Sequence, residues 1–450
     1  MDLKKTNEIL DKALNFIVSE EFSDEQKVQI EQDTLENFDR HINPGWLKYR
    51  KSVSTNSAAV EFRDHDSCYV DLYGNEYIDC LGGFGIFNFG HRNPEILKYV
   101  EAQLKHQALH SQELLDPLRG YLAEALSSIT PGDLQYCFFT NGGAEAVEMA
   151  LKLSRIATGK RHYIATINGF HGKSMGALSV SGKDTYRAPY IPSVQQVSHV
   201  TYGNIDELET TIFKLQKVGE QIAAVILEPI QGEAGIIVPP EGYLKNVRTL
   251  CDKHDIVLIL DEIQTGMART GTFFRCEAEG ITPDIMTYGK AFGGGIMPIT
   301  GIIARPKMWI EKLKENPWIL GSPTFGGNPI CCAAALGAIN FMVKHDVPKM
   351  SREKGDYVMK ALKKLQEKYP KIIVDVRGVG LMIGIEFPST EVGYSISKGL
   401  FSRKVMIAGT LNNAATLRLE PPSTMKYSDF DKVFTCMDAA LADTKKQFNL

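Results

Sequence analysis

Short apolar runs alternate with helical patterns through the middle of the chain. Apolar residues recur at helical spacing in AEAVEMALKLSRIA (144–157) and EGYLKNVRTLCDKH (241–254). The apolar runs that we expect to be strands are QYCFFT (135–140), HYIATI (162–167), AAVILEP (223–229), IVLILDE (256–262), DIMTYG (284–289) and TGIIA (300–304). This alternation predicts an α/β fold with a mostly parallel sheet between two layers of helices.

The two ends of the chain carry different patterns. Ile9, Leu10, Leu14 and Ile17 recur at helical spacing, which predicts an amphipathic helix in a charged arm. Gly74-Asn75 separate two alternating runs, which predicts a β-hairpin. Helical patterns fill 329–367, strand-like IIVDVRGVGLMIGIEF follows at 372–387, and a last helix begins after 427. We therefore predict an arm at 1–40, the first part of a smaller α+β domain at 41–95, a large domain at 96–328, and the rest of the smaller domain at 329–450.

Composition narrows the class of protein. The 450 residues include 50 basic and 54 acidic side chains, a net charge of −4, so no electrostatic argument favours a nucleic-acid partner. The longest apolar runs, such as AAVILEPI (223–230), are too short to cross a bilayer. The eight cysteines form no C-x-x-C pair, and the N-terminus has no signal-peptide pattern. We expect a cytoplasmic protein with reduced thiols and no membrane partner.

Polar residues directly after the apolar runs are the candidates for chemistry, because ligands of open α/β sheets bind at the carboxyl ends of the strands. NGGAEAVEM (141–149) leads from a strand through two glycines into a helix, whose free N–H groups could bind a phosphate; an ordinary strand–helix turn is the alternative. The full set of such residues is Asn141, Gly142, Gly143, Glu228, Asp261, Gln264 and Lys290.

Within this set, Asp261 and Lys290 point to one cofactor. Asp261 ends an apolar strand, where it could cap a turn or keep a ring nitrogen protonated. Lys290 follows the next strand, where it could extend into water or react with a carbonyl. A phosphate site, a carboxylate for a pyridinium and a reactive amine together are what pyridoxal 5′-phosphate requires. Phe170 and His171, after another strand, could lie against its ring or be ordinary core and surface residues.

These motifs resemble the class-III pyridoxal-phosphate aminotransferases over about residues 40–445. The matching stretches are NGGAEAVEMALKLSR (141–155), GFHGK (169–173), LEPIQGE (227–233), LILDEIQTGMARTG (258–271), GKAFGGG (289–295) and TFGGNP (324–329). The resemblance implies a fold-type-I transferase with a large domain and a smaller one built from both chain ends. It also implies a homodimer, or a dimer of dimers, with active sites shared between subunits.

The resemblance assigns roles residue by residue. Lys290 would attach the cofactor aldehyde and then act as general base and acid, while Asp261 would face the pyridine nitrogen. The other implied cofactor contacts are Gln264 at the phenolic oxygen, Phe170 and His171 against the ring, Glu228 nearby, the N–H groups of Gly142, Gly143 and Ala144 at the phosphate, and Thr324 reaching the phosphate across the dimer. Relatives often carry hydroxyl side chains in the phosphate turn, and this chain has none there. It also has Ala268 where relatives commonly carry glycine.

The resemblance extends to substrates. CLGGFGIFNFGHRNP (80–94), HSQELLDPLRG (110–120), AGTLNNAATLRLEPP (408–422) and NPGWLKYRKSV (43–53) are similar to members that act on terminal diamines, putrescine and cadaverine, with 2-oxoglutarate as acceptor. Glu233 and Arg418 match a pair that hides or exposes the arginine for a carboxylate; a surface ion pair is the alternative. Transaminases of ornithine, acetylornithine or 4-aminobutyrate, an aminomutase or racemase of the same fold, and a protein that binds the cofactor without catalysis stay open as other interpretations.

Overall fold

The structure is a computed structural model that describes residues 1–50 and 58–450. The last residues of NPGWLKYRKSV and part of the predicted segment 41–95 therefore lie outside the described residues. Contacts divide the chain into two units, Met1–Arg63 with Tyr69–Tyr77, and Asp64–Cys68 with Ile78–Leu450. The division that we predicted from the sequence, with breaks near 40, 95 and 328, stays a prediction.

The first unit contains the N-terminal helices. Its elements are α1 (Leu3–Val18), α2 (Asp24–Asn37), the π-helix η1 (Phe38–Ile42) and α3 (Gly45–Tyr49), with most of β1 (Glu61–His65) and β2 (Cys68–Asp71) and half of β3 (Glu76–Asp79). Asp2 caps α1 by accepting from Lys5 N, and Ser23 caps α2 by accepting from Gln26 N. The predicted amphipathic helix is present as α1, and Ile9, Leu10, Leu14 and Ile17 are exposed on it. The predicted hairpin is present too, as β2 and β3 with Gly74 in the turn.

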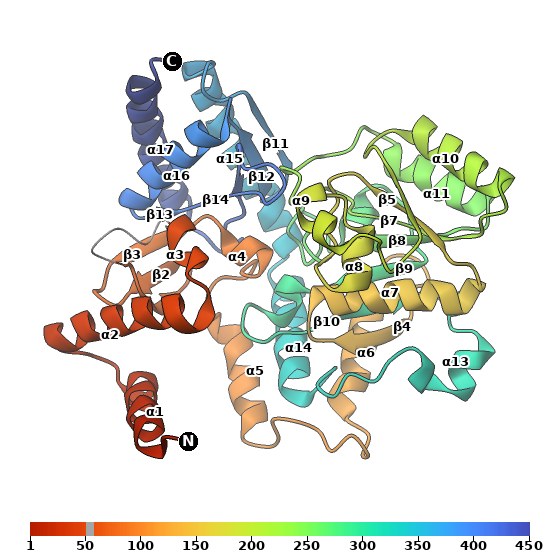
Figure 1. Cartoon of the computed structure of the whole chain (residues 1–450), viewed down its shortest axis with the longest axis horizontal. Coiled ribbons are helices and arrows are strands. Elements are labelled where there is room, and N and C mark those ends of the chain that lie inside the picture. Colours follow the sequence, from red (N-terminus) through yellow and green to blue (C-terminus); the bar gives the residue numbers. More distant parts are fainter. Residues whose placement is uncertain (51–57) are drawn as a thin grey trace. The chain divides into compact units, whose positions relative to one another are not determined.

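A seven-stranded sheet organises the second unit (Figure 1). The strand order is β4-β10-β9-β8-β7-β5-β6, and only β10 runs antiparallel to its neighbours. This confirms the mostly parallel sheet. The strands are β4 (Tyr136–Thr140), β5 (His162–Thr166), β6 (Val197–Val200), β7 (Ile222–Leu227), β8 (Val257–Asp261), β9 (Ile285–Tyr288) and β10 (Thr300–Ala304). All six predicted strands are present, and β6 was not predicted.

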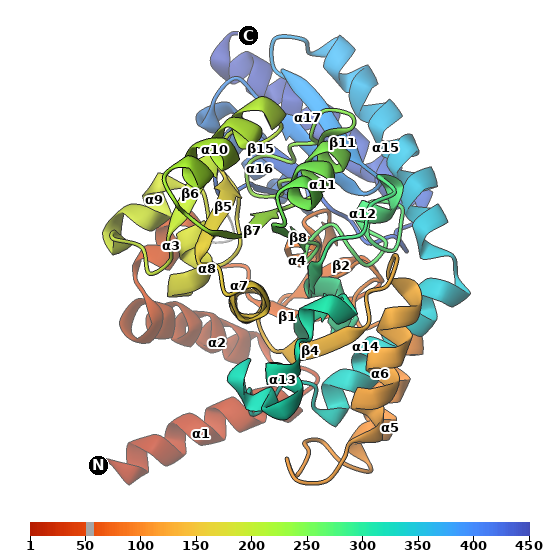
Figure 2. The same cartoon turned by 90° about the vertical axis from the view of Figure 1, so that its right-hand side faces the viewer.

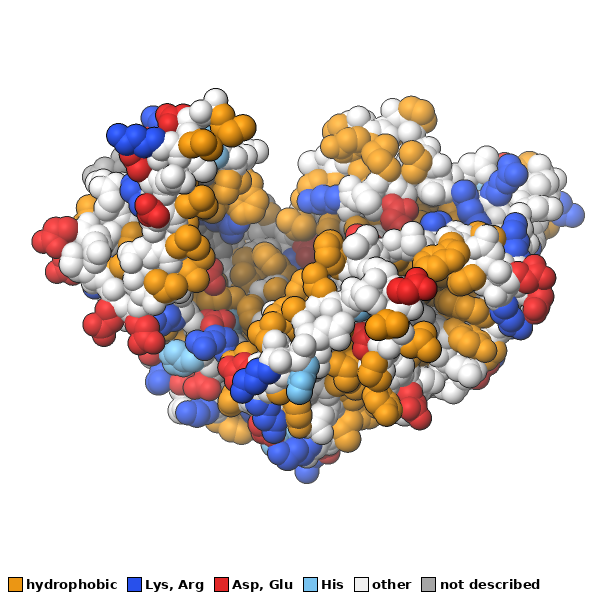
Figure 3. Space-filling view, turned by 90° about the horizontal axis from the view of Figure 1, so that it is seen from below, with side chains coloured by type: hydrophobic (Ala, Val, Ile, Leu, Met, Phe, Trp, Pro, Cys, Tyr) orange, Lys and Arg blue, Asp and Glu red, His pale blue; other side chains and the backbone are white. Residues whose placement is uncertain are grey.

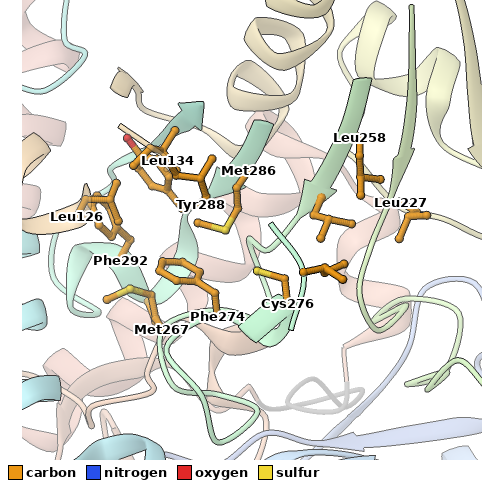
Figure 4. Packing of buried hydrophobic residues seen from close by; sticks show 14 of the residues in the cluster. Leu126, Leu134, Leu227, Leu258, Met267, Phe274, Cys276, Met286, Tyr288 and Phe292 are labelled. Carbon is orange, nitrogen blue, oxygen red and sulfur yellow. The ribbon is translucent and has the colours of Figure 1, made fainter. Parts of the chain in front are cut away.

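Helices cover both faces of this sheet because its strands are apolar on both faces. Along β8, Val257 and Ile259 belong to the core under α7 and α8, while Leu258 and Leu260 belong to the core on the opposite face. Figure 2 shows α7 nearly end-on, and Figure 4 shows part of the opposite core, to which Leu258, Met286 and Phe274 belong. The helices around the sheet are α4 (Gly82–Gly85), α5 (Pro94–Leu104), α6 (Pro117–Ile129), α7 (Gly143–Thr158), α8 (Met175–Val180), α9 (Asp184–Arg187), η2 (Ala188–Tyr190), α10 (Ile205–Lys217), α11 (Tyr243–Lys253), α12 (Arg275–Ala278), η3 (Lys290–Gly293), η4 (Pro306–Met308), α13 (Glu311–Glu315), η5 (Pro317–Ile319) and α14 (Pro329–Lys344).

The C-terminal part of the second unit has its own sheet and core. Strands β11 (Asp375–Val379), β12 (Met382–Glu386), β15 (Thr416–Leu419) and β14 (Ala408–Gly409) pair in that order, all antiparallel. The other elements are α15 (Val347–Lys368), α16 (Thr390–Ser402), α17 (Tyr427–Phe448) and β13 (Val405–Met406), which pairs in parallel with Ile78 and Asp79 of β3. The strand-like stretch predicted at 372–387 is confirmed and contains two strands, β11 and β12, and the last helix is confirmed as α17.

Two surface properties bear on the sequence predictions. Acidic and basic side chains are mixed on the face drawn in Figure 3, without a large patch of one sign. Within the described residues no single helix is long and apolar enough to cross a membrane; α14 and α15 meet that test only as a pair, and they are bent by 67°.

Candidate active site

The carboxyl ends of four parallel strands bring most of the predicted residues together. Strands β5, β7, β8 and β9 pair in parallel, so the residues that follow them lie at the same edge of the sheet. A cavity of about 250 Å³ lies there. Every predicted cofactor contact lines this cavity except Gly142 and Thr324; the lining includes Gly143, Ala144, Phe170, His171, Glu228, Asp261, Gln264 and Lys290.

Lys290 projects from a sharp turn directly after β9. It begins η3 with a left-handed backbone (φ 48°), a conformation that costs a lysine free energy. Its neighbour is Gly289, where a Cβ would lie 2.8 Å from Thr300 Cγ2. Among the described residues the Lys290 amine has no hydrogen-bond or salt-bridge partner. Burial lowers the pKa of Lys290 despite the opposing effects of Glu420 and Glu233. The amine is thereby more readily neutral, and a neutral amine is the form that attacks a carbonyl or accepts a proton.

Asp261 is buried and fixed by three donors. Thr287 Oγ1, from the neighbouring strand β9, donates to Oδ1 at 2.8 Å, and Ile263 N donates to the same oxygen at 3.2 Å. His171 Nδ1 bonds Oδ2 at 2.8 Å. Burial opposes protonation of His171, but the hydrogen bond and charge of Asp261 raise the pKa of His171 above its ordinary value. A carboxylate held in this way can stabilise a positive charge on a ring nitrogen.

Glu228 holds the loop that carries Phe170. Its Oε1 accepts from Phe170 N at 2.9 Å, and its Oε2 accepts from Gly232 N at 3.0 Å. Burial raises the pKa of Glu228 to about 7, with the charge of Asp261 adding to the effect. The direct role of Glu228 in the structure is therefore to position the loop and Phe170.

The start of α7 supplies N–H groups to the cavity. Gly142 caps this helix, and Glu145 Oε2 accepts from Asn141 N at 2.9 Å and Gly142 N at 3.2 Å. The N–H groups of Gly143 and Ala144 lie in the first turn, where the helix offers them no carbonyl. These two can bind a phosphate. The N–H of Gly142 is already engaged by Glu145, and its predicted phosphate contact stays a prediction.

Glu233 and Arg418 form a buried, two-pronged ion pair. Arg418 Nη1 donates to Glu233 Oε1 at 2.9 Å, and Arg418 Nη2 contacts Oε2. Leu411 N also donates to Oε2, at 2.9 Å. Burial opposes the charges, but each partner favours the charged form of the other, so the pKa of Glu233 is lowered and that of Arg418 is raised. The surface-pair interpretation is therefore wrong for this pair, because Arg418 has no exposed side-chain area.

Two site residues were not found from the sequence. Thr287 holds Asp261, and Glu420 Oε1 accepts from Gln264 Nε2 at 2.8 Å. Glu420 directly follows β15, so the search for polar residues after apolar runs could have found it in the C-terminal sheet as well. Thr287 lies inside a strand, and no sequence signal separates it from an ordinary strand threonine.

Thr324 lies apart from this cavity. Its side chain is exposed, and its carbonyl oxygen accepts from Gln112 Nε2. Its predicted contact across a dimer stays a prediction.

The residues present fit pyridoxal phosphate. A reactive amine, a buried carboxylate and free helix N–H groups line one cavity, and they match the aldehyde, the ring nitrogen and the phosphate. His171 Nε2 is buried and has no hydrogen-bond partner among the described residues, as expected where a bound group would cover it. Lys290, Asp261, Gly143 and Ala144 would hold the group.

Comparison with known proteins agrees with this geometry. A family model described as aminotransferase class-III matches residues 51–441. A protein of Pectobacterium atrosepticum named putrescine aminotransferase is 48% identical over 424 residues, which are 93% of this chain and 90% of the relative.

Solved structures of transaminases have the same fold. A transaminase from the marine bacterium Virgibacillus matches with a TM-score of 0.85 and 26% identity over 93% of this chain and all of its own. An (S)-enantioselective omega-transaminase from Thermomicrobium roseum matches with a TM-score of 0.83 and 27% identity over 92% of this chain and 98% of its own. The chain belongs to the class-III aminotransferases, which use pyridoxal phosphate.

Proposed function

We propose that this aminotransferase moves the amino group of putrescine, and of cadaverine, to 2-oxoglutarate. The products are glutamate and, from putrescine, 4-aminobutanal, which closes to 1-pyrroline. The observation that carries the proposal is the buried Glu233–Arg418 pair. Such a pair suits an enzyme whose donor has no carboxylate and whose acceptor has two. The putrescine aminotransferase relative supports the choice of donor.

Lys290 acts in proton transfer. When bound, pyridoxal phosphate supplies an electron sink for the donor carbon that loses its proton. Lys290 Nζ takes that proton and would deliver it to the cofactor, which a lysine with a lowered pKa does well near neutral pH. The turn at Gly289 and Lys290 places the lysine side chain at the cavity.

Asp261 and the residues around it orient the ring. Asp261, whose position is fixed by Thr287 and His171, would keep the ring nitrogen protonated. Phe170, in a loop held by Glu228, would help to hold the ring. Gln264 would hold the phenolic oxygen, and Gly142, Gly143 and Ala144 would hold the phosphate.

The Glu233–Arg418 pair controls which substrate the cavity accepts. While the pair is closed, the arginine charge is hidden and a diamine enters without repulsion. When 2-oxoglutarate enters, Glu233 turns away and Arg418 binds a carboxylate with two hydrogen bonds. Leu411 N loses its acceptor in that state, so the loop around Leu411 moves with the switch.

The proposal includes an assembly and a location. We infer a homodimer or a dimer of dimers, in which Thr324 of the partner subunit contacts the phosphate. A smaller domain built from both chain ends and a cytoplasmic location complete the proposal. The eight cysteines, all free in the structure, support a reducing compartment.

A donor panel tests the function. Purified enzyme is mixed with 2-oxoglutarate and with putrescine, cadaverine, ornithine, acetylornithine or 4-aminobutyrate, and glutamate is measured. The proposal expects the largest kcat/KM with putrescine. Turnover of ornithine or 4-aminobutyrate without turnover of putrescine would assign the enzyme to another class-III activity. Isomerisation without any oxo acid would identify an aminomutase, and no turnover of any donor would favour a protein that binds the cofactor without catalysis.

A further inference from the structure

Glu420 is a buried carboxylate with one uncommitted oxygen. Its side chain has no exposed area, and its Oε1 accepts from Gln264 Nε2 at 2.8 Å. Its Oε2 is buried and has no hydrogen-bond partner among the described residues. A buried charge without a partner is costly in free energy, so a cation is expected to meet this oxygen at some stage of the reaction.

The lysine side chain lies beside this oxygen. A Cβ built on Gly85 would lie 3.6 Å from Lys290 Cδ and 3.8 Å from Glu420 Oε2. The lysine stem and the carboxylate oxygen therefore flank the same point. Glu420 also has the largest effect among the groups that favour the charged form of Lys290.

The other charged groups near Lys290 are already paired. Glu233 is bound by Arg418 and by Leu411 N, and Glu228 accepts from Phe170 N and Gly232 N. Two carboxylates near the lysine are thus satisfied, and Arg418 is occupied by one of them.

The remaining cation near Glu420 is committed as well. Arg269 donates to Asn88 Oδ1 and to the carbonyl oxygens of Leu381 and Pro421. Among the residues that the structure describes, Arg418 Nε is buried without a hydrogen-bond partner, but both Nη atoms of Arg418 are held by Glu233. No donor of Lys290 is used within the described chain, and Lys290 carries a full charge only after it has taken a proton.

We propose that Glu420 is a positioning residue for Lys290, and that its Oε2 binds the Lys290 ammonium each time the freed lysine carries the proton taken from the donor carbon. The proton moves from that carbon to Lys290 Nζ and from there to the cofactor. Glu420 neither gains nor loses a proton. The carboxylate stabilises the charge that develops on Nζ and keeps the amine near the reacting atoms. The proposal rests on the aminotransferase reaction and is independent of the donor.

The first test compares Glu420→Gln with wild type in steady-state kinetics. Glutamine still accepts from Gln264 Nε2 but has no charge. We expect kcat to fall about tenfold or more with putrescine, with KM nearly unchanged. The same fall is expected with n-butylamine, a donor whose tail carries no charge. A loss confined to putrescine and seen mainly in KM would instead identify Glu420 as a diamine-binding residue and overturn the proposal.

The second test measures the amine itself. The holoenzyme is first converted to the amino form of its cofactor with donor alone, which frees Lys290. The pH dependence of acylation of Lys290, followed by peptide mass spectrometry, gives its titration midpoint. In Glu420→Gln this midpoint is expected at least about one pH unit lower than in wild type. An unchanged midpoint would overturn the proposal.

Two further variants separate charge from structure. Glu420→Asp keeps the charge and is expected to restore most of the midpoint and of kcat, which a purely steric role would not do. Glu391→Gln, a change of an exposed carboxylate on α16, is expected to match wild type in both measurements. Should wild type fail to use putrescine, any donor active in the panel serves for these tests, so the failure of the proposed function and of this proposal are distinguishable.

Discussion

Two buried aspartates lie at opposite ends of neighbouring parallel strands, and their surroundings differ. Asp284, directly before β9, accepts from Leu258 N and pairs with Arg248 at 2.8 Å and Lys307 at 2.5 Å. Burial opposes its charge, but Arg248 and Lys307 hold the pKa of Asp284 below its ordinary value.

Asp261, at the end of β8, has a threonine, a backbone N–H and a histidine as neighbours, and no lysine or arginine bonds it in the described chain. At the edge where Asp284 lies, the protein supplies the cations. At the catalytic edge, where Asp261 lies, His171 is the bonded titratable partner, and we propose that the cofactor brings a further positive charge. A buried carboxylate without a permanent cation is thus a better sign of a site than burial alone.

The largest expected effect is at the lysine of the catalytic edge. Lys290→Ala removes both the point of attachment and the proton acceptor, so glutamate formation should fall by about 10⁴-fold or more. Borohydride reduction followed by peptide mapping should show a cofactor adduct at Lys290 in wild type and none in the variant. An adduct on another side chain would show that the site is assigned wrongly.

Asparagine at each aspartate tests the comparison directly. Asp261→Asn is expected to lower kcat by about 10²- to 10³-fold, because the ring nitrogen loses its negative partner. Asp284→Asn is expected to leave kcat unchanged and to lower the free energy of unfolding by about 3 kcal/mol, because buried positive charges lose their partner. Urea unfolding and steady-state kinetics on both variants measure this. The contrast between the two edges fails if both variants lose the same property.

Removing Arg418 from the Glu233–Arg418 ion pair is expected to have a smaller effect, which is confined to binding of the acceptor. Arg418→Ala should raise the apparent KM for 2-oxoglutarate about 100-fold, since a bidentate contact to a carboxylate is lost. The amine half-reaction, followed by the cofactor spectrum without acceptor, should proceed in the variant. An unchanged KM for 2-oxoglutarate would refute the switch.

The buried carboxyl group of Glu228 is expected to make the stability of the folded protein depend on pH. Burial raises its pKa from 4.5 to about 7, so the folded protein keeps a proton that the unfolded chain releases in this range. Stability therefore falls as the pH rises from 4.5 to 7, by up to about 3 kcal/mol from this group. Glu228→Gln should remove most of this fall, which urea unfolding at pH 5 and pH 8 would measure. An identical slope in the variant would contradict the assignment.

The sequence predicted the sheet better than it predicted the contacts around the cofactor. The strand runs are apolar on both faces, so their pattern is strong, whereas β6 (VSHV) is short and partly polar and gives little signal. The strand-end rule found Asp261, Glu228 and Lys290, because parallel strands place their ends at one edge.

Contacts between distant parts of the chain could not be predicted in this way. Glu420 reaches Gln264 across 156 residues. Sequence spacing carries no information on which donors such side chains occupy. The apolar residues of α1 show the same limit, since their spacing predicted the helix but not what covers it.

The backbone of Lys290 implies that the reaction is supported at the expense of the fold. At φ 48° a side chain of any kind is strained, and glycine is not. Both Lys290→Gly and Lys290→Ala are expected to be inactive. The free energy of unfolding of Lys290→Gly should be higher than that of Lys290→Ala by about 1 kcal/mol, so the glycine variant should also unfold at a higher temperature. Replacing Lys290 by glycine would relieve this backbone strain, and the resulting protein would no longer catalyse the reaction.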